Sequence, residues 1–443
     1  MKQLVIVLIV MLCAAPAWAE KREKYSWEKD LKHRLLRDFS KTHDEVKKYI
    51  QGYLPYVTDE DMAEWERTRA LEVMTINGEK RYFHSAGPNL FRIDSACVAL
   101  KRYITGPVKG THDDEDLADM HELFKTASSS PNHTGAPKTM RVTYTLTVNA
   151  DAVPSGEKIR CWLPLPREDF ARQQDVKLIS TSEKHFKRSP EAYHHSSVYM
   201  EKKAQAGKPT VFSETFEYTV LGQWFNLKPE DVKPYDTSSK LYKEYTSERE
   251  KHIIFTPELR RVADSLTSGI YNPLLKARKI FAWINDTKPW ASAREYSTID
   301  NIPMYVLQNG HGDCGQQTLL FLTLCRICGI PGHFQSGFRM QPSGWNLHDW
   351  CEIYFEGIGW VPVDQSFGFP DYASNDDEHW FFLGGMDAWR MVVNDDYGMP
   401  LYPKKKYPRS ETVDFQRGEV EWAGGNLYFD QWRYNMKIEY LKQ

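Results

Sequence analysis

The sequence has no long hydrophobic run beyond its first twenty residues, so no later segment is apolar enough to cross a membrane. The one apolar run, residues 4–13, is too short to be a permanent anchor. Lys2 precedes this run and Ala17-Trp18-Ala19 follows it, in the order typical of a secretory signal peptide. We therefore expect residues 1–19 to be removed, and the mature protein to be periplasmic or extracellular without membrane insertion.

An excess of charge of one sign is also absent. The chain has 57 lysine and arginine residues against 60 aspartate and glutamate residues. It therefore has no broad positive field that would attract nucleic acid or an anionic membrane. No internal repeat or low-complexity tract is present. The hydrophobic content of 41% is that of an ordinary globular chain, and the length predicts about two to three domains.

Cysteine is sparse, and six cysteines remain once the predicted signal peptide is removed. Cys325 and Cys328 form a C-x-x-C pair, but it lies inside a predicted helix and lacks a second ligand pair at zinc-finger spacing. Two cysteines three residues apart on one helix also have poor geometry for a disulfide. We expect this pair to pack in the core, few or no disulfides, and neither a metal nor a cofactor.

The first segment, residues 20–136, is predicted to be mainly helical and to end in a linker. Thr42 and Glu45 form a capping box at the start of one helix. Asn77-Gly78 between two short β-like runs predicts a hairpin. The stretch "TASSSPNHTGAPK", residues 126–138, is rich in Ser, Pro and Gly, which is typical of a linker.

Residues 137–230 change to the period of a strand. Apolar and polar side chains alternate from Arg141 to Val148, which predicts a half-buried strand. The stretches "KIRCWLPLP", "DVKLIS" and "VFSETFEYTV" predict further strands with turns between them. We expect this segment to be a small antiparallel β-sandwich.

Helices return in residues 231–443, the third predicted domain. Thr256-Pro257 and Asn272-Pro273 each place a capping residue before a proline at the first helical position. The C-terminal extension is aromatic-rich and too irregular to assign. Together the three segments predict an α+β protein.

The stretch "NGHGDCGQQTLLFLTLCRICGIPGH", residues 309–333, places Cys314 at the start of an apolar helix. Asp313 and Gln316 form the D-x-x-Q version of a capping box. A helix N-terminus favours the thiolate through its dipole and its unpaired N–H groups, and those donors could also hold an oxyanion. The alternative is a buried structural cysteine, since free cysteine is usually buried. A candidate general base elsewhere in the sequence would favour the catalytic interpretation of Cys314.

A base is found downstream. "LHDWCEIYF" alternates from His348, and "WVPVD" returns as the partner strand that ends at Asp364. Adjacent antiparallel strands can bring His348 beside Asp364, while the helix lays Cys314 against the same end of the sheet. Each residue alone has a structural explanation, but together they form the nucleophile, base and orienting carboxylate of a catalytic triad.

These stretches and their spacing resemble the core of the transglutaminase-like superfamily, from about Leu274 to Gly368. The resemblance implies a papain-like fold in which Cys314 is the nucleophile, His348 the base and Asp364 the third member. "WLPLPRE", residues 162–168, resembles the domain that often precedes such cores in secreted bacterial members. The sequence departs from the family at Asp349, where a small residue usually follows the histidine. We expect this change to alter the groove and leave the triad intact.

The resemblance implies chemistry through a thioester at the cysteine, which water or an amine then resolves. For an exported bacterial protein we expect hydrolysis of a peptide or amide bond in a peptide or protein substrate. One alternative is a protein-crosslinking transglutaminase. Another is a noncatalytic scaffold whose β-sandwich binds a surface partner. The oligomeric state cannot be predicted from the sequence.

Overall fold

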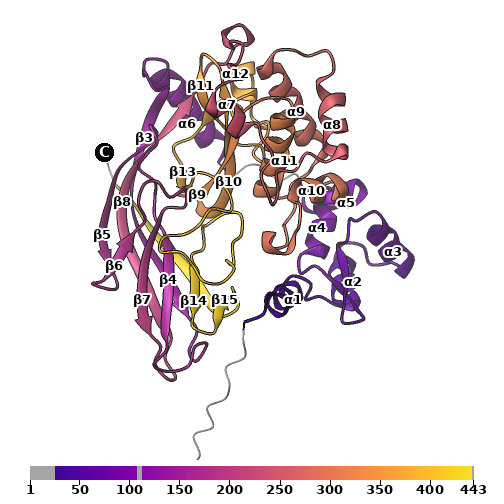
Figure 1. Ribbon diagram of the computed structural model, residues 1–443. Helices are drawn as coiled ribbons and strands as arrows, with labels where there is room; N and C mark the ends of the chain where they lie inside the picture. Colours follow the sequence, from indigo (N-terminus) through magenta and orange to yellow (C-terminus); the bar gives the residue numbers. More distant parts are fainter. Residues whose placement is uncertain (1–24, 107–111, 442–443) are drawn as a thin grey trace, which may run out of the picture.

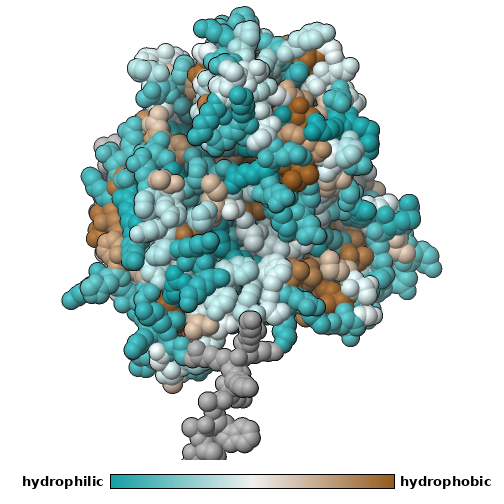
Figure 2. All heavy atoms as spheres, viewed as in Figure 1, coloured by the Kyte–Doolittle hydropathy of each residue, from teal (hydrophilic) through white to brown (hydrophobic). Residues whose placement is uncertain are grey.

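The computed structural model describes residues 25–106 and 112–441, and the predicted signal peptide lies outside these ranges. The chain is α+β, with most helices on one side, antiparallel sheets on the other, and α6 beside β3 on the side of the sheets (Figure 1). None of the described helices is long and apolar enough to cross a membrane. Hydrophilic residues cover most of the face seen in Figure 2, and hydrophobic residues form only small separate groups there.

The N-terminal part has its own apolar core, which includes Phe39, Tyr82 and Leu90. The predicted capping box is confirmed, because Thr42 and Glu45 each cap the other's backbone N–H. The predicted hairpin is also confirmed. The elements of the N-terminal part are α1 (Trp27–Asp38), α2 (His43–Gln51), α3 (Asp59–Arg67), β1 (Val73–Ile76), β2 (Glu79–Tyr82), α4 (Ala86–Ile93) and α5 (Ser95–Thr105). The next helix, α6 (Asp113–Ala127), packs in a different core through Met120, Leu123 and Ala127.

Two five-stranded antiparallel sheets face each other across a second core, in which Val142 and Phe216 of one sheet meet Trp162 of the other. The first sheet has the order β12-β8-β3-β16, with β5 also paired to β8, and the second has the order β15-β14-β4-β7-β6. Their strands are β3 (Thr134–Val148), β4 (Lys158–Pro164), β5 (Gln173–Thr181), β6 (Phe186–Arg188), β7 (Ser197–Lys203), β8 (Thr210–Trp224), β12 (Gly385–Met386), β14 (Glu419–Trp422), β15 (Gly425–Leu427) and β16 (Trp432–Leu441).

The two sheets therefore combine strands of residues 134–224 with strands from the C-terminal part of the chain. Strand β16 pairs with β3 along its whole length, from Trp432 opposite Val148 to Leu441 opposite Thr139. The predicted boundaries had grouped these C-terminal strands with residues 231–443. The sheet order joins them instead to the strands of residues 137–230, because their hydrogen-bonding partners are about 300 residues away and give no local signal.

The third core lies between a four-stranded sheet and a layer of helices. The sheet has the order β11-β10-β9-β13, and all its neighbours are antiparallel. Thr256 and Asn272 cap helices with proline at the first position, as predicted. The remaining elements are η1 (Pro229–Asp231), α7 (Lys240–Tyr245), α8 (Pro257–Thr267), α9 (Pro273–Thr287), η2 (Tyr296–Thr298), α10 (Ile302–Asn309), α11 (Cys314–Ile327), β9 (Gly332–Gln341), β10 (Gly344–Phe355), β11 (Gly359–Val363), α12 (Asp376–His379) and β13 (Arg390–Asn394).

The central strand β10 presents a different side chain set to each face of its sheet. Cys351 and Ile353 share a core with Leu319 of α11. Trp350 instead packs with Met386 and other residues outside the helical layer. Because successive side chains of a strand point to opposite faces, the odd-numbered residues of the second half of β10 face α11 and the even-numbered residues there face away from it.

Candidate active site

Cys314 is the first residue of the buried helix α11. Asp313 is the N-cap and accepts from the Gln316 backbone N–H at 3.1 Å, while the Gln316 side chain caps the Asp313 N–H in return. The predicted capping box is therefore confirmed. Every residue from Gly315 to Arg326 is buried, so the helix is fixed by packing on all sides and holds the thiol in one place.

A carboxyl group, not an imidazole, is hydrogen-bonded to the sulfur. Cys314 Sγ donates to Asp349 Oδ2 at 3.3 Å. The Tyr296 hydroxyl donates to Asp313 at 2.6 Å and also lies 3.3 Å from Asp349 Oδ2. Burial, followed by the charges of Asp349 and Asp313, raises the pKa of Cys314 well above its usual value. In this conformation burial, reinforced by the two acidic neighbours, outweighs the helix dipole, which is worth at most about 2 kcal/mol, and the thiol is favoured over the predicted thiolate.

Asp349 is itself shifted toward its neutral form. Burial, reinforced by the charge of Asp313, raises the pKa of Asp349 to about 8. Its Oδ1 accepts from Gln416 Nε2 at 3.0 Å, so the carboxyl is held from the side opposite the sulfur. At neutral pH the pair is therefore mainly a thiol beside a neutral carboxyl.

His348 and Asp364 form the buried pair that the strand register predicts. His348 Nε2 lies 2.6 Å from Asp364 Oδ2, and Arg390 Nη2 donates to the same oxygen at 2.9 Å. Burial alone would raise the pKa of Asp364, but His348 and Arg390 lower it to about 2. An ionised carboxylate can only accept, so Nε2 carries the proton and the Nδ1 lone pair is the basic site of a neutral ring. Within residues 25–106 and 112–441, Nδ1 of His348 has no hydrogen bond.

The three predicted residues are thus divided between two contacts. His348 is joined to Asp364, whereas Cys314 is joined to Asp349, and among the described residues no hydrogen bond links Cys314 to His348. The reason is the alternation of β10, which directs residues 348 and 349 to opposite faces. Asp349, the residue that departs from the family pattern, therefore contacts the Cys314 sulfur directly, whereas we had expected it to change only the shape of the groove.

A cavity of about 220 Å³ opens at Cys314. Part of its wall comes from η2 and the loop before it, and part from the C-terminal stretch that the sequence left unassigned. In that stretch Arg417 donates to both carboxylate oxygens of Glu295 at 2.8 Å and to Glu411 at 2.6 Å. Gln416 and Arg417 were missed because they follow no recognisable motif. Arg390, which holds Asp364, was missed for the same reason.

One cluster of the described residues could hold a metal ion. It consists of His333, Glu352 and Asp395, whose ligand atoms lie within 4.8 Å of one another. Both ring nitrogens of His333 already lie beside carboxylates, Nε2 at 3.1 Å from Glu352 and Nδ1 at 3.2 Å from Asp395. Burial would lower the pKa of His333, but the two carboxylates raise it to about 10. The imidazolium therefore supplies the positive charge that balances this cluster.

Comparison with known proteins identifies the domain that contains these residues. Residues 260–365 match the transglutaminase-like superfamily. The chain contains a transglutaminase-like domain. Cys314, His348 and Asp364 all fall within the matched residues of this domain. Curated proteins give no match to the sequence.

Solved structures resemble larger parts of the chain at low identity. A protein of Cytophaga hutchinsonii, named as a putative cysteine protease, is 12% identical, with a TM-score of 0.47 over 70% of this chain and 93% of that one. The periplasmic domain of TgpA from Pseudomonas aeruginosa is 14% identical, with a TM-score of 0.28 over 56% of this chain and 91% of that one.

Proposed function

We propose that the protein is an exported cysteine hydrolase that cleaves peptide or amide bonds through a thioester at Cys314. The observation that supports this most directly is the His348–Asp364 pair, in which an ionised carboxylate holds one imidazole nitrogen and leaves the other free. The next residue of the same strand, Asp349, touches Cys314. The proposed base, His348, is thus adjacent in sequence to the residue that contacts the proposed nucleophile. The proposal includes the papain-like core and the β-sandwich predicted from the sequence.

In the proposed reaction, His348 Nδ1 accepts the thiol proton of Cys314 as the sulfur attacks the substrate carbonyl carbon. Because the side chains of His348 and Asp349 leave β10 on opposite faces, this step requires a rearrangement of the strand in which the Asp349 carboxyl leaves the sulfur and the imidazole reaches it. Backbone N–H groups at the start of α11 stabilise the oxyanion. The amine product then leaves with the proton from His348, and the acyl group stays on the sulfur as a thioester.

Water resolves the thioester in this proposal. His348 takes a proton from the water, the hydroxide attacks the thioester carbonyl, and the thiolate of Cys314 leaves and regains a proton. We favour water because the 220 Å³ cavity at Cys314 is the recognisable substrate space at the sulfur, and a crosslinking enzyme would also need to shield the thioester from water. Export, which the first nineteen residues indicate, would place the enzyme among extracellular peptides.

A fluorogenic peptide library tests this function, with wild type and Cys314→Ala measured side by side. Release of acid and amine products by wild type alone is the expected result. A second series adds a primary amine at millimolar concentration and compares free acid with amide product. Predominant amide, or lysine-linked dimers, would favour the crosslinking alternative. Absence of any turnover across the library would favour the noncatalytic scaffold.

A further inference from the structure

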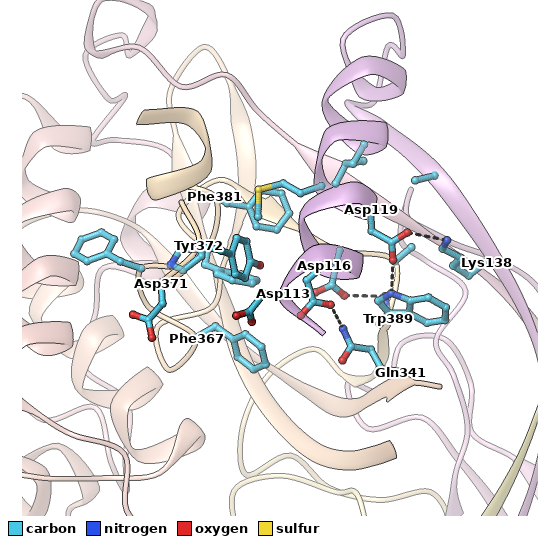
Figure 3. Close-up of a pocket in the computed structure, with 18 of the residues that line it drawn as sticks. Asp113, Asp116, Asp119, Lys138, Gln341, Phe367, Asp371, Tyr372, Phe381 and Trp389 are labelled. Atoms are coloured by element: carbon cyan, nitrogen blue, oxygen red, sulfur yellow. Dashed lines mark hydrogen bonds and ion pairs between the residues drawn. The ribbon is translucent and has the colours of Figure 1, made fainter. Parts of the chain in front are cut away.

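A second cavity lies away from Cys314, on the side of α6. It has a volume of about 730 Å³, within the usual range for sites that bind small molecules or side chains. Figure 3 shows the aspartates of α6 on one side of this cavity, facing Phe367 and Tyr372. The loop after β11 and the segment around β12 complete the wall.

Carboxylates predominate among the charged groups of the cavity. Five aspartates line it, against Arg102 and Lys138. Two of the five are balanced within the protein, because Lys138 pairs with Asp119 at 3.1 Å and Arg390 with Asp387 at 2.7 Å. The other three have no ion pair among the described residues, and they are Asp113, Asp116 and Asp371.

Asp113 and Asp116 are half-buried, and Asp371 is exposed. Asp116 accepts from Gln341 Nε2 at 2.8 Å. Burial, followed by the charge of Asp387, raises the pKa of Asp116, while Arg339 acts in the opposite direction without forming an ion pair. A cation placed in the cavity would relieve this crowding of negative charge.

The side chain of Gln341 has an acceptor without a hydrogen-bond donor in the described part of the chain, which is a second observation independent of the carboxylates. It is only 5% exposed and lines the cavity beside Asp116 (Figure 3). Its Oε1 atom is buried and has no hydrogen-bond partner among the described residues. A buried acceptor left unsatisfied costs about 1–3 kcal/mol, so a ligand that donates hydrogen bonds would be favoured at this point.

Aromatic rings supply the rest of the wall, and one of them already holds an ammonium group. The Lys138 Nζ atom lies 5.0 Å from the centroid of the Trp389 ring while it pairs with Asp119. The aromatic residues that line the cavity are Phe367, Phe369, Tyr372, Phe381, Phe382 and Trp389. Aromatic faces and carboxylates together select cations that have an apolar stem.

The cavity adjoins the His348–Asp364 pair. The ring of Phe367, one wall of the cavity, lies 5.0 Å from the His348 ring, centroid to centroid. Arg390 donates to Asp364 at 2.9 Å and to Asp387 of the cavity at 2.7 Å. A cation that binds beside Asp387 would therefore act on the same arginine that holds the catalytic carboxylate.

We propose that this cavity binds a primary alkylammonium group, with its charge among Asp113, Asp116 and Asp371 and its aliphatic stem against the aromatic wall. Such a group occurs both as a lysine side chain in a peptide and as a free diamine. Binding itself does not depend on catalysis, but a role in substrate selection rests on the proposed hydrolase function.

Calorimetry on the full chain tests the inference, with Cys314→Ala so that no turnover disturbs the titration. The probes are Nα-acetyl-lysine amide, the neutral isostere Nα-acetyl-norleucine amide, and cadaverine. Asp113→Asn is compared with Asp114→Asn, a matched control because Asp114 is exposed on the same turn and does not line the cavity. Asp116→Asn is measured as well, with circular dichroism to check folding.

The lysine probe should bind, and the norleucine probe should bind at least about tenfold more weakly, since one charged hydrogen bond is worth about 1.5–3 kcal/mol. Asp113→Asn and Asp116→Asn should each weaken lysine binding by about tenfold, whereas Asp114→Asn should not. Cadaverine binding as tightly as the lysine probe would support a free diamine as the ligand. Equal binding of lysine and norleucine probes, or equal effects of the Asp113 and Asp114 variants, would overturn the inference. Loss of peptidase activity alone would not, because binding is measured without turnover.

Discussion

Replacing Asp349 by asparagine should make Cys314 more reactive, most clearly at alkaline pH. Asp349 Oδ2 is the hydrogen-bond partner of the Cys314 sulfur, at 3.3 Å, and its charge contributes to the raised pKa of the thiol. Asparagine has nearly the same shape and keeps an acceptor for Gln416 Nε2. It removes the negative charge and places an amide donor near the sulfur, and both changes favour the thiolate.

The size of the effect follows from the charges. Two like charges about 4 Å apart repel by about 4 kcal/mol at an effective dielectric constant of about 20, which is an upper limit for a partly screened pair. One third of that energy is about 1.4 kcal/mol, or about tenfold in the thiolate fraction. We therefore expect alkylation of Cys314 to be at least about tenfold faster in Asp349→Asn than in wild type at pH 9.

The difference should grow with pH, because burial raises the pKa of Asp349 to about 8. Below this value the carboxyl is mainly neutral and opposes the thiolate weakly, and above it the charge opposes the thiolate fully. The assay is iodoacetamide alkylation from pH 6.5 to 9.5, with the labelled cysteine identified by peptide mass spectrometry and the melting temperature as a check on folding. Equal or slower alkylation of Cys314 in Asp349→Asn at pH 9 would refute the reasoning.

Three further predictions concern the proposed triad and the cluster of His333, Glu352 and Asp395. Cys314→Ala should keep the melting temperature of wild type within a few degrees and lose all turnover, because the thioester step has no substitute nucleophile; retained turnover would remove Cys314 from the mechanism. Asp364→Asn should lower kcat more than it raises KM, since it removes the negative charge beside His348 and can present an amide donor to Nε2, which favours the wrong tautomer of the ring; a raised KM at unchanged kcat would make Asp364 a binding residue. His333 has a pKa of about 10 in the folded protein, above its ordinary value of 6.5, so its contribution to stability is present below pH 6.5 and is lost as pH rises through about 10. The melting temperature of wild type should therefore fall more steeply between pH 7 and 10 than that of His333→Gln, and parallel curves would show that His333 is not the titrating group.

Local signals predicted individual helix starts and turns well. The capping boxes at Thr42 and Asp313 and the hairpin at Asn77-Gly78 depend on residues within one turn of each other, and the structure has all of them. The approach of Asp364 to His348 followed from the strand order, because the two strands are joined by a tight turn and their register is therefore short-range.

Features that depend on distant residues were not predictable in the same way. The pairing of β16 with β3 joins the C-terminal strand to a strand about 300 residues earlier in the chain. Arg390 reaches Asp364 from a strand with no recognisable motif. Asp349 contacts the sulfur because its side chain lies on the face of β10 that packs against α11. A sequence pattern shows that side chains alternate between the two faces of a strand, but it does not show which face packs against a given helix.

The most direct test of the central claim is to trap the acyl group on the protein. Wild type and Cys314→Ala are mixed briefly with an activated peptide ester, quenched in acid, and measured by intact-protein and peptide mass spectrometry. We predict an adduct of the acyl mass on Cys314 of wild type, which disappears with time as the free acid is released, and no adduct in Cys314→Ala. An adduct on another residue, or acid release by Cys314→Ala at the wild-type rate, would contradict the proposal that Cys314 forms a thioester.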